Sequence, residues 1–150
     1  MLAQLTELEK LQDYAYTHHI DVYLKYSDSE HKGTCLVSDT GHAVLINKRV
    51  ITNDQEEICI LAEEIGHIET NTVLPAGDYL NPYYKRYLKR QNEVLASRSA
   101  IQRLLPPERV QEAADTGHRS INSIAGYCGV TPELVEEALS YYKRKGHEFE

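Results

Sequence analysis

The 150-residue sequence contains few cysteines and no long apolar run. Its three cysteines, Cys35, Cys59 and Cys128, include no Cys-x-x-Cys pair, which argues against both a disulfide framework and a thiolate zinc site. No apolar stretch reaches the length of a membrane span, and residues 1–13 lack the basic start and apolar run of a secretion signal. We therefore expect a protein of the reducing cytoplasm, with residues 1–13 as part of the mature fold.

Basic residues are also in the minority, because 23 Asp and Glu face 16 Lys and Arg and the formal net charge is -7. Broad non-specific binding to nucleic acid is disfavoured, since phosphate contacts need Lys and Arg. One basic segment, residues 83–90, mixes Lys and Arg with tyrosines. We read it as a solvated helix start with the tyrosines packed beneath, and a local basic patch is the alternative.

A single domain of the α+β class is expected, because no repeat or low-complexity linker divides the chain. An amphipathic helix opens it, since apolar residues recur at helical spacing at Leu2, Leu5, Leu8, Leu11 and Tyr14. Three short β-prone segments follow, at residues 21–24, 33–38 and 42–46, with Asp39–Gly41 as a hairpin connection. They predict a small, mainly antiparallel three-stranded sheet.

The remaining sequence is helical in pattern. One helix is expected over residues 54–70, with Thr52 as its N-cap candidate, and its apolar stripe is wide enough for burial nearly all round. A long helix then ends before Pro106 and Pro107. We divide the domain, residues 1–150, into a core at 1–106 and a helical extension at 107–150, with a turn at Gly129.

The helix at residues 54–70 carries the chemistry. Glu63 and His67 are four residues apart and share one face, while Glu64 lies beside them. The spacing resembles that of His-Glu-x-x-His, in which two ligands hold zinc and the Glu between them is the general base. The helix contains no Lys or Arg, so two carboxylates in an apolar helix favour a divalent cation. Gly66 beside His67 would permit close approach of a backbone or ligand.

A third ligand must come from another element, and Glu93 is the best candidate. It shares a helical face with Ala96, Ala100 and Leu104, so we expect a buried carboxylate on a small, apolar face. The alternative is a surface Glu that pairs with a neighbouring Lys or Arg.

Two segments resemble the ImmA/IrrE family of metallopeptidases. Residues 61–67, Leu-Ala-Glu-Glu-Ile-Gly-His, are similar to its active-site helix in the Glu-Glu-x-Gly-His form of short phage and mobile-element members, and residues 91–106 are similar to its second motif. The resemblance covers about residues 21–106 and implies a zincin-like fold. It also implies Glu63, His67 and Glu93 as metal ligands and Glu64 as the catalytic base.

The resemblance further implies a zinc endopeptidase that cleaves a transcriptional repressor of a phage or mobile element. Glu63 stands where a His is usual, and a set of two Glu and one His makes a harder site that can also admit Mn²⁺. Two other functions remain open. One is a non-catalytic antirepressor that binds its repressor, and the other is a DNA-binding regulator.

The DNA-binding alternative depends on residues 120–139, which resemble a helix-turn-helix. Their second helix begins with Glu133, Glu136 and Glu137, where a DNA-reading helix usually carries basic or amide side chains, so nucleic acid is not the expected partner. Three further candidates have simpler roles. His18 and His19 are expected in a surface turn and Cys59 as a buried structural thiol, while His42 is not assigned.

Overall fold

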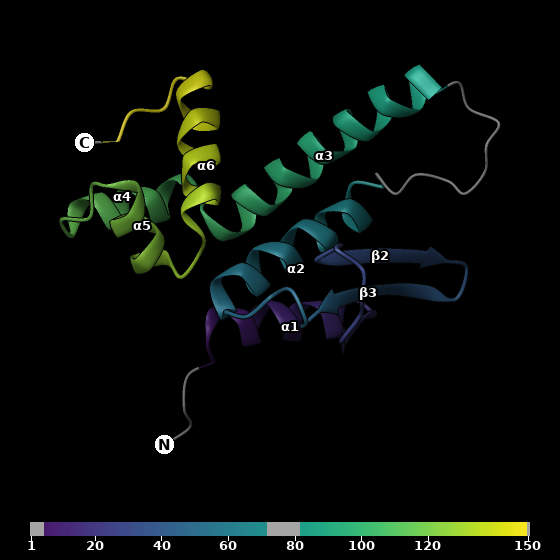
Figure 1. The fold of residues 1–150 in the computed structure, drawn as a ribbon. Coiled ribbons are helices and arrows are strands. Elements are labelled where there is room, and N and C mark those ends of the chain that lie inside the picture. Colours follow the sequence, from purple (N-terminus) through teal and green to yellow (C-terminus); the bar gives the residue numbers. More distant parts are fainter. Residues whose placement is uncertain (1–4, 72–81, 150) are drawn as a thin grey trace.

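The computed structural model describes residues 5–71 and 82–149, and Figure 1 shows the arrangement of their helices and strands. The order is one helix, three strands and five helices in this part of the chain, so the predicted α+β class is confirmed. The elements are α1 (Glu7–Thr17), β1 (Ile20–Lys25), β2 (Gly33–Ser38), β3 (Gly41–Asn47), α2 (Asp54–Glu69), α3 (Pro82–Leu104), α4 (Pro107–Asp115), α5 (Ile121–Cys128) and α6 (Pro132–Arg144). The predicted contribution of Leu2 to the first helix lies outside the described residues.

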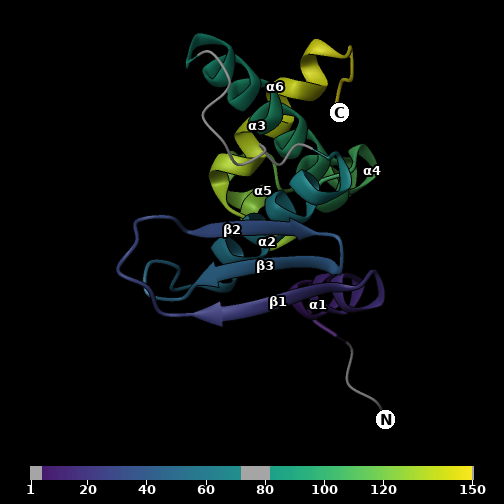
Figure 2. The ribbon, with the colours of Figure 1, turned by 90° about the vertical axis from the view of Figure 1, so that its right-hand side faces the viewer.

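Helix α2 lies at the centre of the molecule. The sheet and α1 pack on one side of it and α3 packs on the other, as Figures 1 and 2 show together. Ile58, Leu61 and Ile65 of α2 are at most 2% exposed, so the wide apolar stripe of its sequence corresponds to burial on several sides. A helix in this position can expose polar side chains only where the sheet layer and α3 leave it uncovered.

The sheet is mixed, and the expectation of a mainly antiparallel sheet is wrong for one of its two ladders. The hairpin at Asp39–Gly41 forms, and β2 pairs with β3 in antiparallel fashion. However, β1 pairs with β3 in parallel, which gives the order β1-β3-β2 and makes β2 an edge strand. The central strand supplies the most buried residues of the sheet, Val44 and Ile46.

The parallel ladder depends on the connection between β1 and β2, which carries the chain past β3. Asn47, at the end of β3, holds this connection. Its side-chain amide donates to the carbonyls of Ser27, Ser29 and His31 at 3.0–3.3 Å, and its Oδ1 accepts from the Ser27 backbone N–H. Asn47 is only 4% exposed, so these bonds satisfy an otherwise costly buried amide.

Helix α2 begins at Asp54, as its sequence predicts, but its N-cap is one residue later than expected. Asn53 is the N-cap and accepts from the Glu56 backbone N–H, so the expectation that Thr52 caps the helix is wrong. Both residues are good N-caps, and local sequence does not separate them.

The first turns of α3 extend beyond α2 in Figure 1. Tyr83, Tyr84 and Tyr87 are more than half exposed there, so the expectation of tyrosines packed beneath a basic segment is wrong. After α3, the turn at Gly129 forms with φ of 71°, and α6 packs against α3. None of the helices in the described ranges combines the length and the apolarity that a membrane span requires.

Candidate metal centre

One edge of α2 carries Glu63, Glu64 and His67 where the helix passes between the sheet and α3. His67 is 8% exposed, and both glutamates are partly buried. Lysine side chains from outside α2 do form ion pairs with two other glutamates of this helix. Lys32 pairs with Glu56 at 2.5 Å, and Lys48 pairs with the buried Glu57.

Neither Glu63 nor Glu64 forms an ion pair with Lys or Arg within residues 5–71 and 82–149. Both partly buried carboxylates therefore lack a Lys or Arg partner in this part of the chain, and a divalent cation could compensate their charge.

Gly66 brings α3 close to this edge. A Cβ atom on Gly66 would lie 2.9 Å from the Ala96 carbonyl oxygen of α3 and 3.1 Å from the Ser99 Cβ, both tighter than normal contact. The hydrogen side chain therefore allows the two backbones to approach. The close approach that the sequence indicated at Gly66 is made by the backbone of α3 and occurs one residue from His67.

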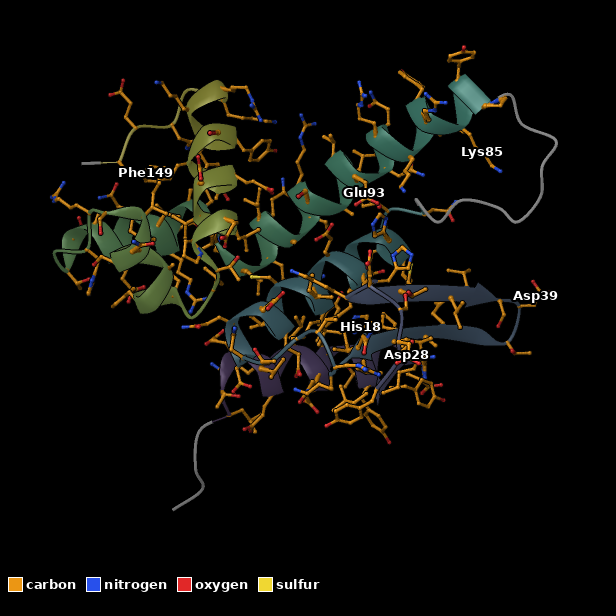
Figure 3. The ribbon with its side chains drawn as sticks, in the orientation of Figure 1. His18, Asp28, Asp39, Lys85, Glu93 and Phe149 are labelled. Carbon is orange, nitrogen blue, oxygen red and sulfur yellow. The ribbon has the colours of Figure 1, made fainter. Side chains whose placement is uncertain are left out.

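This approach brings Glu93 to the face of α2 that carries Glu63 and His67. One ligand atom from each of the three side chains lies within 4.8 Å of the others, and His67 Nε2 is 3.6 Å from Glu93 Oε2. Figure 3 shows Glu93 on the side of α3 that faces α2. The structure thus brings together all three residues that the sequence indicated as metal ligands.

Glu93 differs from its prediction in one respect. Its side chain is 49% exposed, so the expectation of a buried carboxylate is wrong, although Ala96, Ala100 and Leu104 of the same face are buried. The face becomes buried only where α3 crosses α2, and Glu93 lies one helical turn before that crossing. Solvent therefore reaches the centre from the side of Glu93.

The electrostatics of the cluster match a cation site. Burial raises the pKa of Glu63 to about 7, with further contributions from the charge and hydrogen bond of Glu93 and from the charge of Glu64. Carboxylates in such proximity need either a shared proton or a positive ion. A divalent cation coordinated by Glu63, His67 and Glu93 fits this donor set, because two carboxylates balance its charge and imidazole is a common partner.

Glu64 points to the sheet side of α2 and meets Cys35 of β2. Burial raises the pKa of Glu64, whereas a hydrogen bond with the Cys35 thiol and the charge of His67 lower it. Burial and the nearby Glu64 charge raise the pKa of Cys35 to about 12, so the thiol remains protonated and can donate to the carboxylate. A Cβ on Gly33, two residues earlier in β2, would lie 2.5 Å from Ile60 Cγ2 and 3.2 Å from Glu64 Cγ, so glycine permits this close strand–helix contact.

The sequence reading did not find the contact between Cys35 and Glu64. Alternation along β2 was the available signal, since it places Gly33 and Cys35 on the same face of the strand. Which face of β2 meets α2 depends on the order of the strands, which the sequence pattern does not give.

The other candidates lie apart from the cluster. His18 Nδ1 is 2.8 Å from the Tyr14 carbonyl oxygen at the end of α1, and His19 occupies the following turn. Cys59 is buried, and its sulfur lies 3.6 Å from the Thr131 hydroxyl at the start of α6. Nδ1 of His42 is buried and has no hydrogen-bond partner in the part of the chain that is described.

The comparison with protein families agrees with this geometry. The family model of peptidase M78, described as the IrrE N-terminal-like domain, matches residues 15–140, which is well over half of the chain. The chain belongs to the peptidase M78 family. Its α+β fold, with a small mixed sheet, is consistent with the M78 domain, and M78 is a family of metal-dependent peptidases. No curated protein and no solved structure matches the chain.

Proposed function

We propose that this M78 domain is a metal-dependent endopeptidase that cleaves a transcriptional repressor of a phage or mobile element in the cytoplasm. The observation that carries the proposal is the convergence of Glu63, His67 and Glu93 within 4.8 Å, with a partly buried Glu64 beside them. Family membership supports the peptidase class, and the repressor substrate is an inference from the resemblance of residues 61–67 to mobile-element members.

Each residue has a distinct part in this proposal. Glu63, His67 and Glu93 hold the cation, for which Zn²⁺ is the first choice and Mn²⁺ the alternative. When bound, the cation supplies Lewis acidity, which makes water easier to deprotonate and a peptide carbonyl more electrophilic.

Glu64 accepts a proton from the attacking water as the new C–O bond forms. It then donates that proton to the nitrogen as the C–N bond breaks. Its raised pKa makes it a stronger base than an ordinary carboxylate, which favours the first step. The Cys35 thiol orients this carboxylate through the hydrogen bond that they share.

The variant Glu64→Gln tests the proposal. Glutamine keeps the size of the side chain but cannot accept the proton, and general bases contribute roughly 10²–10⁴-fold to rate. We expect the variant to keep its fold and metal content and to lose cleavage. The measurement is co-expression with the repressor encoded nearest to this chain, followed by blotting for a shortened product. Glu108→Gln, an exposed carboxylate on α4, is the control and should cleave normally.

A second outcome would favour the non-catalytic antirepressor. If wild type and Glu64→Gln both relieve repression while the repressor stays intact, binding accounts for the function and the peptidase proposal is wrong.

A further inference from the structure

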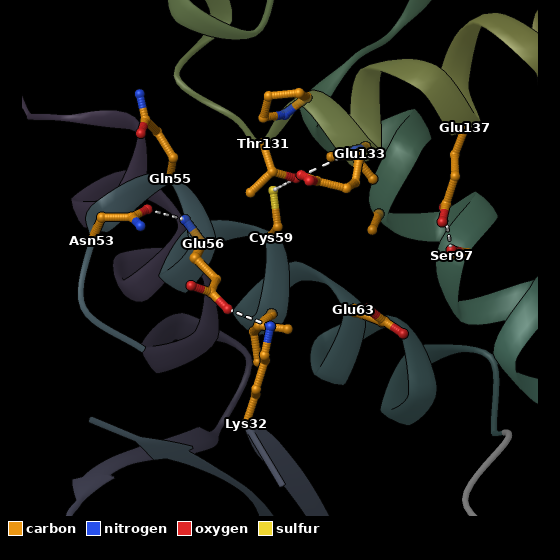
Figure 4. A pocket seen from close by; sticks show the side chains of 14 residues that line it. Lys32, Asn53, Gln55, Glu56, Cys59, Glu63, Ser97, Thr131, Glu133 and Glu137 are labelled. Carbon is orange, nitrogen blue, oxygen red and sulfur yellow. Dashed lines mark hydrogen bonds and ion pairs between the residues drawn. The ribbon is translucent and has the colours of Figure 1, made fainter. Parts of the chain in front are cut away.

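A cavity of about 570 Å³ begins at Glu63 and continues along α2 toward the first turn of the helix (Figure 4). Glu56, Ile60 and Glu63 of α2 line it, together with the N-cap Asn53. Steps of three or four residues keep these side chains on one face of the helix, and His67 is the next member of the same row. The cavity therefore extends the line of the metal centre and shares Glu63 with it.

The opposite wall of the cavity comes from the beginning of α6. Glu133 and Glu137 of this helix are four residues apart and both line the cavity, and Figure 4 shows them across from Glu63. Glu137 accepts a hydrogen bond of 2.9 Å from the Ser97 hydroxyl of α3, which fixes its direction. The helix that resembles the reading helix of a DNA-binding motif thus faces the metal centre.

The two carboxylates of this wall have no cationic partner within residues 5–71 and 82–149. Lys32 lines the cavity, but it is paired with Glu56 at 2.5 Å. Glu133 lies in the first turn of α6, where the helix dipole favours an acid, but Glu137 lies beyond that turn.

We propose that this cavity binds the part of the protein substrate next to the scissile bond and that Glu133 and Glu137 select a Lys or Arg side chain in it. The volume lies in the range of ligand pockets and has room for a long side chain. A guanidinium or ammonium group in this cavity would form charge-assisted hydrogen bonds with the carboxylate it reaches. The position relative to the scissile bond rests on the proposed function, whereas recognition of a basic segment does not require cleavage.

The test is peptide capture by the full chain. The Glu64→Gln form, loaded with Zn²⁺ and immobilised, is exposed to a random pool of acetylated, amidated heptapeptides, and the retained peptides are sequenced by mass spectrometry. We expect Lys and Arg to be enriched at one position by roughly three- to tenfold, the size expected for one or two partly exposed ion pairs.

Two double variants, each also carrying Glu64→Gln, separate the effect of Glu133 and Glu137 from the effect of lost negative charge. Glu133→Gln with Glu137→Gln should abolish the enrichment. Glu108→Gln with Glu136→Gln should retain it, although it removes the same charge. The controls are closely matched, because Glu108 and Glu133 each follow a proline in a first helical turn, and Glu136 neighbours Glu137 outside this cavity.

No enrichment of Lys and Arg, or equal enrichment in both double variants after melting curves have shown that they fold, would overturn the proposal. The proposed function fails separately. Enrichment of Lys and Arg by a protein that does not cleave the repressor would reject the peptidase function and leave the proposed binding cavity standing. Cleavage without enrichment would reject the binding proposal alone.

Discussion

At the scale of the residue, a proton and a cation compete for the carboxylate of Glu63. Without metal, its pKa is raised from 4.5 to about 7, chiefly by burial and then by Glu93. A raised pKa means that the folded state binds the proton more tightly than the unfolded state. The free energy of unfolding from this group is therefore greatest below about pH 4.5 and declines as the pH rises through about 7.

We accordingly expect the melting temperature of the chelated protein to fall between these pH values and that of the zinc-loaded protein to fall less. Bound metal replaces the proton and keeps Glu63 ionised, so the group no longer titrates. Thermal melts across this pH range, with chelator or with Zn²⁺, measure the difference. Glu63→Gln in chelator should also show a shallower slope. Identical slopes for chelated and loaded wild type would contradict a cation at this carboxylate.

At the scale of the element, the contact between α2 and α3 depends on the absence of a side chain at Gly66. We expect Gly66→Ala to lower the free energy of unfolding by about 1–3 kcal/mol, because the new methyl group meets the Ala96 carbonyl and forces the helices apart. The metal affinity should fall with it, since Glu93 moves with α3. Denaturant unfolding and zinc titration measure the two effects.

Gly126→Ala on α5 is the matched control, because a Cβ there meets nothing within 4 Å. It should keep its metal affinity and gain up to about 1 kcal/mol from helix propensity. If Gly66→Ala binds zinc as tightly as Gly126→Ala, the helix contact does not position Glu93.

The elements differ in how well their sequence predicts them. Helical spacing and proline breaks placed α2 and the end of α3 to within a residue or two, because those signals are local. The partner of β1 was not predictable, since parallel pairing depends on a buried amide at Asn47 that binds a connection 16–20 residues earlier. Alternation shows which residues share a face of a strand but does not give the order of the strands.

At the scale of the whole molecule, metal binding should contribute to stability, because its ligands come from two helices that the folded chain holds together. The expected gain is about 2.7 kcal/mol when free metal exceeds its dissociation constant a hundredfold. His67→Ala should lower the bound zinc per chain and largely remove the difference between chelated and loaded melting curves. Metal analysis of protein purified without affinity resins, combined with these melts, tests this. A variant that keeps one zinc per chain and the full difference would place the metal elsewhere.

The candidate site was more predictable than the surroundings that support it. Glu63, Glu64 and His67 follow from spacing on one helix, and Glu93 from its helical face together with a resemblance to known metallopeptidases. The exposure of Glu93, the contact of Cys35 with Glu64 and the place of α6 beside the centre each depend on packing between distant segments. Such packing leaves little trace in a local pattern.

The close contact at Gly66 also holds α3 against α2 at one place, so a rotation of α3 about that contact would move residues near to it and far from it by different amounts. Glu93 lies three residues from Ala96 at this contact, which is about 4.5 Å along the helix axis. Tyr83 lies thirteen residues from Ala96, which is about 20 Å. Over these distances, a rotation of about 5° would move the Tyr83 end of α3 by about 1.7 Å and Glu93 by only about 0.4 Å. A protein that binds the tyrosine-rich end of α3 would therefore displace that end with little movement of Glu93.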